Sequence, residues 1–252
     1  PPAALLQHGA AASLREHIVL HASELQTAAW PRLIDTVRTG MPAFDVTYRV
    51  NIYDYLSGSP SDAESFDNAM TSISQVDDAE IHAVYDFSSY HMVIDVGGGR
   101  GYFLASMLTA HPSLQGILFE VPTVASGSMA FLESQGLMGR CQVLEGDFTV
   151  EIPRGGDLYI FKRVFTSETD QRANLALNNC REAMNRQGKL LMIEPDLGSA
   201  YGGLYDILML AMTGGKLRSQ EEYQELLVGS GFGISQEVHT NSYLNLIEAA
   251  PI

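Results

Sequence analysis

The first third of the chain carries apolar residues at helical spacing. They recur every three to four positions in three stretches, residues 14–25, 30–37 and 66–76. Gly-Met-Pro and Ser-Gly-Ser-Pro turn signals separate the stretches, and Ser61 or Asp62 is expected to cap the third helix at its N-terminus. Residues 1–87 are therefore predicted to form a helical layer.

After residue 88 the pattern changes to short apolar runs that alternate with longer helical ones. Five strand-like runs lie at residues 93–96, 116–119, 142–144, 158–161 and 190–193. Helical stretches are predicted at 103–110, 125–135, 170–184, 204–212 and 220–229. Two final runs, 233–238 and 242–249, are too close for a helical crossover and should pair antiparallel at the far end of the sheet. The pattern predicts an α/β fold of βαβ units with a mostly parallel sheet.

A glycine-rich turn follows the first predicted strand. Residues 97–101 read Gly-Gly-Gly-Arg-Gly, and an amphipathic helix comes next. Glycines at a strand-to-helix turn allow close approach of a ligand, at the sheet edge where open α/β sheets bind them. The dinucleotide fingerprint needs a glycine where this chain has Tyr102, so a pyrophosphate ligand does not fit. The loop suits a ligand without phosphates, whose amine and carboxylate meet backbone groups and a nearby acid such as Asp95.

Two further acids end the next two predicted strands. Glu120 could accept the hydroxyls of a ribose, and Asp147 could accept an amine hydrogen of adenine while Phe148 covers the ring. Either acid alone would also fit a solvated strand end. Together with the glycine turn, they predict S-adenosylmethionine (SAM) as the cofactor.

These motifs resemble a known family. The combination Asp-Val-Gly-Gly-Gly, Phe-Glu-Val-Pro, Gly-Asp-Phe and Phe-Lys-Arg-Val resembles the SAM-dependent small-molecule O-methyltransferases of the caffeate, hydroxyindole and bacterial polyketide-tailoring type. The resemblance extends over nearly the whole chain. It implies a Rossmann-like, seven-stranded class I methyltransferase domain over residues 88–252, with the helical layer binding the substrate.

The resemblance also assigns residues to the site. It places Gly97 under the methionine part of the cofactor, Glu120 on the ribose, and Asp147 and Phe148 around the adenine. Gly99 and Lys162 are also expected to contact the cofactor. Glu120 stands where the family usually has Asp. The family's apolar substrate walls correspond to Met70, Met209 and Met212, although methionines at helical spacing also fit a plain core.

The largest departure from the family is its catalytic base. The family's Leu-His-Asp-Trp motif has a His that accepts the substrate proton, and Thr166 stands in its place. A threonine hydroxyl cannot act as a base near neutral pH. One acid that steadies the His persists as Glu194, and the position of the other is Leu217.

Three interpretations follow from this loss. The protein could methylate by orientation alone. It could instead retain SAM for non-methylating chemistry such as a hydroxylation, decarboxylation or pericyclic reaction, with Arg163 donating to a carbonyl beside the vacated position. It could also be a catalytically silent SAM binder. Arg163 could equally face solvent, and Glu194 could be an ordinary strand-end acid.

The composition of the chain argues against several classes of binding partner. The chain has 252 residues and a formal net charge of −15, which disfavours nucleic-acid binding. Its two cysteines have no metal-ligand spacing, and His17 and His21 lack a matching acid, so no metal site is predicted. No apolar run approaches bilayer length. We expect a cytoplasmic protein that acts on a small molecule, and a homodimer when the front segment found in the family is present.

Overall fold

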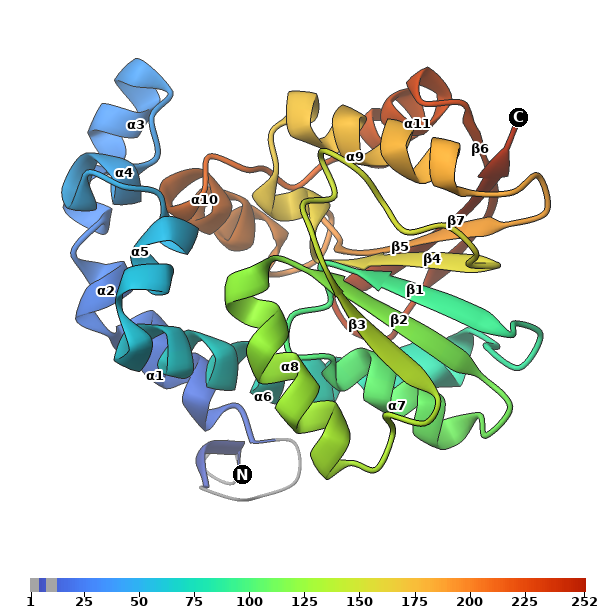
Figure 1. Cartoon of the computed structure of the whole chain (residues 1–252). Coiled ribbons are helices and arrows are strands. Elements are labelled where there is room, and N and C mark those ends of the chain that lie inside the picture. The colour runs from blue at the N-terminus through green and yellow to red at the C-terminus, as the bar shows by residue number, and fades with distance from the viewer. Residues whose placement is uncertain (1–4, 8–12) are drawn as a thin grey trace.

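The seven strands form one sheet in the order β3-β2-β1-β4-β5-β7-β6 (Figure 1). The structure is a computed structural model and describes residues 5–7 and 13–252. The strands are β1 (Met92–Val96), β2 (Gln115–Glu120), β3 (Cys141–Glu145), β4 (Leu158–Lys162), β5 (Lys189–Pro195), β6 (Phe232–His239) and β7 (Leu244–Pro251). The first five pair in parallel, and β7 pairs antiparallel with both β5 and β6. The predicted α/β fold and its antiparallel terminal hairpin are confirmed.

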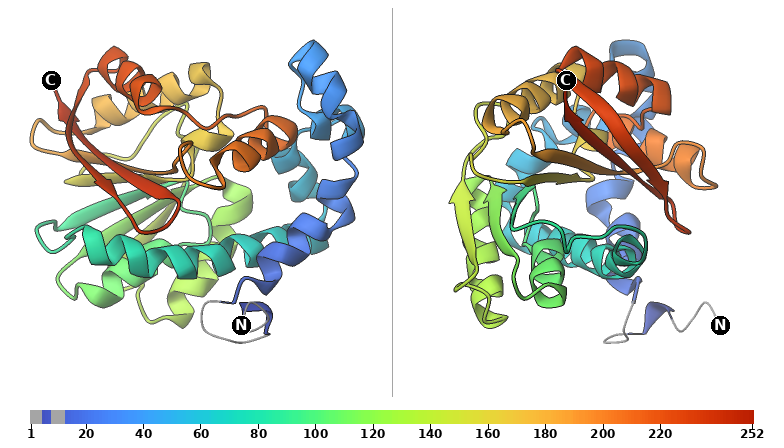
Figure 2. Two further views of the ribbon diagram at one scale, coloured as in Figure 1. Left: turned by 180° about the vertical axis from the view of Figure 1, so that it is seen from behind. Right: turned by 90° about the vertical axis from the view of Figure 1, so that its right-hand side faces the viewer.

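Helices cover both faces of this sheet (Figure 2). They are α7 (Tyr102–Ala110), α8 (Pro122–Ser134), α9 (Asp170–Ala183) and α11 (Gln220–Gly229). Successive side chains along β4 point to opposite faces of the sheet and pack into the hydrophobic core on that face. Leu158 and Ile160 pack with α7 and α8, whereas Tyr159 and Phe161 pack with α9 and α11. Burial on both faces explains why the parallel strands read as continuous apolar runs.

The first third is helical, as predicted, but it contains more helices than the three expected. They are α1 (Arg15–Ala22), α2 (Glu24–Thr27), η2 (Trp30–Arg32), α3 (Leu33–Thr39), α4 (Ala43–Tyr48), α5 (Ile52–Gly58) and α6 (Pro60–Val84). The predicted cap is wrong. Helix α6 begins at Pro60, and the Ser59 hydroxyl donates to Asp62 Oδ2 instead of capping the helix.

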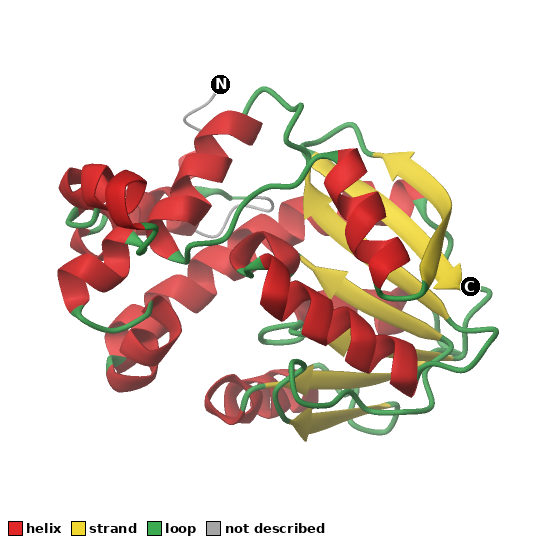
Figure 3. Cartoon of the chain, turned by 90° about the horizontal axis from the view of Figure 1, so that it is seen from above, coloured by secondary structure: helices red, strands yellow, loops and turns green. Residues whose placement is uncertain are grey.

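Two helices connect the helical layer to the sheet. The long α6 packs against α1 and α5 near its start and against α7 further along. Helix α10 (Gly202–Met212) comes late in the sequence but packs on α3 and α4 (Figure 1). Seen from above, a group of helices lies beside one end of the sheet (Figure 3). Its Leu208 and Ala211 share a core with Phe44 of α4. The helical layer therefore includes a segment from beyond residue 88.

Candidate cofactor and substrate site

The glycine turn has the backbone conformation that its sequence requires. Gly97 and Gly99 have φ of 68° and 59°, in the left-handed region that favours glycine. A Cβ on Gly98 would collide with the carboxylate of Asp95. Gly97 and Phe148 are neighbours, because a Cβ on Gly97 would lie 3.7 Å from the Phe148 ring. The structure thus brings the turn after β1 next to the loop after β3.

Glu120 holds the glycine turn against the end of β2. Its Oε2 accepts the backbone N–H of Gly99 at 2.9 Å, and its Oε1 accepts that of Val121 at 2.8 Å. Burial raises the pKa of this carboxyl, and the two N–H donors act in the opposite direction. Each carboxylate oxygen keeps a free lone pair for a further donor such as a ribose hydroxyl.

Asp95 is a buried acid whose two carboxyl oxygens have no hydrogen-bond partner among the residues that the structure describes. Burial raises its pKa to about 7, and Lys162 opposes that shift. Orphaned acceptors are rare in native structures and indicate a missing donor. An amino group of a bound ligand would supply one, so the residues of this edge fit SAM. S-adenosylmethionine carries both that amine and the sulfonium-bound methyl group.

The protonation of Asp95 should make stability depend on pH. Because the folded-state pKa of about 7 lies above the ordinary value of 3.8, the native state binds more protons between these limits. Stability of the cofactor-free protein should therefore fall as pH rises from about 4 to 7. Asp95→Asn removes this loss and should stabilise the protein at pH 8 by up to about 4 kcal/mol, measured by urea unfolding.

The control for this prediction is the pH profile of the variant. Burial also raises the pKa of Glu194 to about 7, so Asp95→Asn should keep part of the slope. A variant with the full wild-type slope, or one less stable than wild type at pH 8, would contradict a neutral buried Asp95.

Asp147 and Phe148 form the turn after β3. Asp147 Oδ1 accepts the backbone N–H and the hydroxyl of Thr149, at 2.8 and 2.7 Å. The Phe148 carbonyl accepts from Asn179, and its ring packs edge-on against Phe161. One carboxylate oxygen of Asp147 makes no such bond. The geometry is compatible with the predicted adenine contact.

Glu120→Ala and Asp147→Ala should each weaken SAM binding by about tenfold or more. The first loses the acceptor that positions Gly99, and the second loses the acceptor that orders the turn; about 1.4 kcal/mol gives tenfold. Titration calorimetry with S-adenosylhomocysteine measures the effect. Glu133→Ala, on the exposed face of α8, is the control. Unchanged affinity in both site variants would refute the pocket assignment.

The end of β4 is tied to α6 by two ion pairs. Lys162 Nζ lies 2.5 Å from Asp78 and 4.4 Å above the Phe103 ring centre. Arg163 pairs with Asp77 at 3.0 Å, and its side chain is only 12% exposed. Its guanidinium also donates to Ser74 and Tyr243.

These contacts correct one expectation for Arg163. It does not face solvent, and its two terminal nitrogens bond to α6 and the terminal hairpin. Its φ of 58° is unusual for a residue other than glycine. This conformation is tolerated where surrounding contacts fix the backbone, and here the ion pair with Asp77 does so.

Thr166 lies in η3 (Phe165–Ser167), directly after β4. The residue is 1% exposed, and its hydroxyl is directed to the carbonyl of Arg163 at 3.5 Å. A Cβ on Gly215 would collide with the Thr166 carbonyl, which explains the need for glycine there. At the second vacated position, Leu217 is buried and its N–H donates to Asp206 Oδ1 at 2.8 Å.

Glu194 fixes the backbone of η3. Its carboxylate accepts the N–H groups of Val164, Phe165 and Thr166, at 3.1, 2.9 and 3.3 Å. Arg218, with a fully buried side chain, donates to the carbonyls of the same loop. Glu194 is thus a satisfied strand-end acid that positions the segment containing Thr166.

The three methionines differ in their surroundings. Met212 is 2% exposed and packs in the helical core, so it offers no surface to a ligand in this structure. Met70 and Met209 are partly buried against the same core. Met209 lies beside the candidate reaction site, where its sulfur accepts from Ser167 at 3.9 Å. Met70 and Met209 remain candidates for the substrate wall.

The sequence did not predict the residues from other parts of the chain that contact Lys162, Arg163 and the η3 loop at the end of β4. They are Ser74, Asp77, Asp78, Arg218 and Tyr243. One signal was present, since the adjacent acids Asp77-Asp78 match the adjacent bases Lys162-Arg163. Within residues 5–7 and 13–252, no three His, Cys, Asp or Glu side chains are grouped to bind a metal ion. None of the helices in that part of the chain is long and apolar enough to cross a membrane.

Known proteins share this architecture. A family model described as the O-methyltransferase domain matches residues 30–233. Phenazine O-methyltransferase PhzM of Lysobacter antibioticus is 37% identical over 257 residues, which cover 100% of this chain and 75% of that protein. An 8-amino-8-demethylriboflavin N,N-dimethyltransferase of Streptomyces davaonensis is 35% identical, over 93% of this chain and 69% of its own length.

One solved structure that resembles this chain contains bound ligands. The O-methyltransferase NcsB1 from neocarzinostatin biosynthesis, in complex with SAM and 2-hydroxy-5-methyl naphthoic acid, superposes with a TM-score of 0.88. It is 31% identical, and the match covers 98% of this chain and 75% of that one. The fold, the glycine turn with its acids and these matches agree: the chain belongs to the O-methyltransferase domain family of SAM-dependent enzymes.

Proposed function

We propose that this protein transfers a methyl group to a hydroxyl of a small aromatic or polyketide-type natural product, by orientation and without a histidine base. The observation that carries the proposal is that the candidate SAM-binding residues are in place, whereas the position of the family's catalytic base is occupied by Thr166. Glu120 binds the glycine turn, whereas the Thr166 hydroxyl is buried and directed to a backbone carbonyl.

SAM supplies an electrophilic methyl group when bound. The role of the chain's residues is to hold it and to align an acceptor. The Glu120–Gly99 contact fixes the binding loop, and Glu194 fixes η3 opposite it. Alignment of two reactants can supply several kcal/mol of barrier lowering, and an acidic phenol ionises without help from the protein.

The proposed acceptor is a flat aromatic molecule. The relatives named above act on or bind a phenazine, a flavin and a naphthoic acid, according to their names. Met70 and Met209 offer polarizable apolar surface of the kind that suits such rings.

An aromatic amine is the second candidate acceptor. A neutral amine attacks through its lone pair and needs no base beforehand, which suits a site with Thr166 at the base position. The N,N-dimethyltransferase relative shows that the family includes such chemistry. Non-methylating chemistry has less support, because the proposed donor Arg163 is engaged by Asp77, Ser74 and Tyr243.

Transfer of label from methyl-labelled SAM to a phenol or an aromatic amine tests this function. The homodimer, the cytoplasmic location and a domain boundary after residue 87 stay predictions of the sequence.

A further inference from the structure

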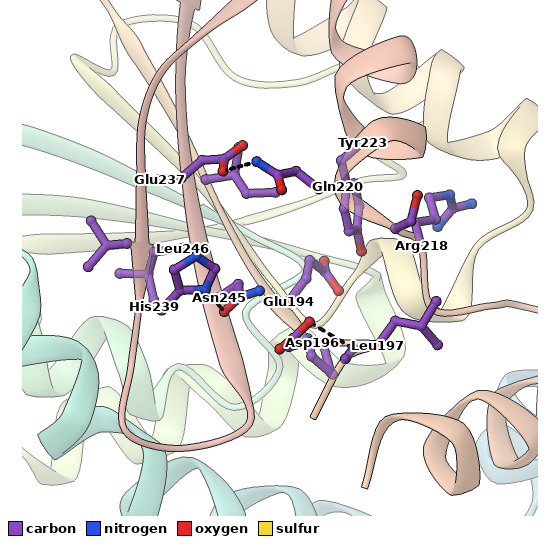
Figure 4. A pocket seen from close by; sticks show the side chains of 15 residues that line it. Glu194, Asp196, Leu197, Arg218, Gln220, Tyr223, Glu237, His239, Asn245 and Leu246 are labelled. Atoms are coloured by element: carbon purple, nitrogen blue, oxygen red, sulfur yellow. Dashed lines mark hydrogen bonds between the residues drawn. The ribbon is translucent and has the colours of Figure 1, made fainter. Parts of the chain in front are cut away.

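A second pocket lies behind Glu194, away from the glycine turn. It has a volume of about 310 Å³ and is bounded by the end of β5, the start of α11 and the β6–β7 hairpin (Figure 4). None of the glycine-turn residues and no residue of η3 lines it. Its size falls within the range of small-molecule pockets.

The pocket contains a buried hydroxyl without a partner. Tyr223 of α11 is 3% exposed, and its buried hydroxyl has no hydrogen-bond partner of suitable geometry in the described part of the chain. Burial raises the pKa of this hydroxyl, and the Arg218 guanidinium next to it opposes that shift. Figure 4 shows this hydroxyl directed toward Glu194, on the pocket side. A buried hydroxyl without a partner is costly, so its position indicates a ligand group with hydrogen-bonding capacity.

The charges around the pocket are mainly negative. Asp196 and Glu237 line it, and each of these carboxylates retains lone pairs beyond its bonds to the protein. Glu194 also lines it, but its carboxyl group holds η3 and burial raises its pKa to about 7. Arg218 also lines it, but its guanidinium donates to Asp170 and to two backbone carbonyls of the η3 region. His239 bonds through its Nδ1 to Asn245 Oδ1 at 2.7 Å.

Apolar side chains form the remaining walls. Leu197 lies beside Asp196, and Leu246 lies on the hairpin beside Asn245 (Figure 4). Val238 completes the apolar lining. Carboxylates interspersed with apolar side chains complement an amine attached to a compact hydrophobic group. An anion would meet these carboxylates, and the described lining residues offer no free cation to balance them.

We propose that this pocket binds a small organic cation, an amine on a compact apolar group, at a site separate from that of the cofactor and the methyl acceptor. The ammonium group pairs with the carboxylates and the Tyr223 hydroxyl, and the apolar group contacts the hairpin.

Benzylamine is the probe, titrated by calorimetry into the protein saturated with S-adenosylhomocysteine. We expect saturable binding in the millimolar range, weakened about tenfold by Glu237→Gln because the variant removes a charge-assisted interaction with the ammonium group. Tyr223→Phe should also weaken it while keeping the ring in place. Glu225→Gln, which removes the same charge from the exposed face of α11, should have no effect.

Benzyl alcohol, which has the same shape without the charge, should bind at least about tenfold more weakly. Three results would overturn the proposal: no saturable binding, equal binding of the alcohol, or binding that neither Glu237→Gln nor Tyr223→Phe alters. Displacement of benzylamine by a methyl-acceptor phenol would also overturn it, because the probe would then occupy the substrate site.

Discussion

Replacing Thr166 with histidine is expected to raise methyl transfer to a weakly acidic phenol by about 10- to 100-fold. A general base typically contributes more than this, but the new imidazole must displace a buried side chain. Thr166 follows the end of β4, and the carboxylate of Glu194 already lies against its backbone. An imidazole there would therefore have an acid nearby to hold its orientation.

The gain should depend on pH in a defined direction. Imidazole accepts a proton only when neutral, so the advantage should be full above about pH 7 and lost below about pH 6. Thr166→Gln is the control, since it adds a polar side chain of similar size that does not titrate. An equal gain in both variants, or no gain while cofactor binding is intact, would contradict the view that the site lacks only a base.

Replacing Glu194 with alanine is expected to destabilise the protein by about 3 kcal/mol or more and to abolish most activity. The change leaves three buried backbone N–H groups without their acceptor. A buried donor without a partner costs about 1–3 kcal/mol. Without these hydrogen bonds, η3 and Thr166 would no longer be fixed opposite the cofactor edge.

Glu194→Gln is the matched variant, because its carbonyl oxygen can still accept the N–H groups of Val164 and Phe165. It should retain most of the stability, as measured by urea unfolding. If the alanine variant loses less than about 1 kcal/mol, or if glutamine is as damaging as alanine, Glu194 does not hold η3 through these bonds.

The sheet could be predicted because its signal is local. Strands buried on both faces read as short apolar runs, and the turns between them carry glycine and acids. The helical layer was harder to predict, because some of its short helices end without a glycine or proline turn signal. Helix α4, for example, is followed by Arg49 in a left-handed conformation with φ of 64°, and an arginine at this position does not predict the end of a helix.

The candidate cofactor residues could be proposed from the sequence because they follow the ends of successive strands. The residues that hold them in place come from distant parts of the chain. Asp77 lies 86 positions before Arg163, and nothing local predicts that α6 crosses the end of β4. For the same reason the sequence could not decide whether Arg163 faces solvent or the site. The loss of the base followed from the family resemblance, because Thr166 stands at the position of the family's histidine. The orientation of the Thr166 hydroxyl required the structure.

The most direct test of the account is methyl transfer with an isotopically labelled SAM methyl group, using a panel of phenols, aromatic amines and polyketide-type aromatics. The account predicts label in a methylated product, with S-adenosylhomocysteine formed in equal amount, and a strong loss in Glu120→Ala. A substrate transformed without label while SAM remains intact would contradict it and indicate that this fold performs other chemistry.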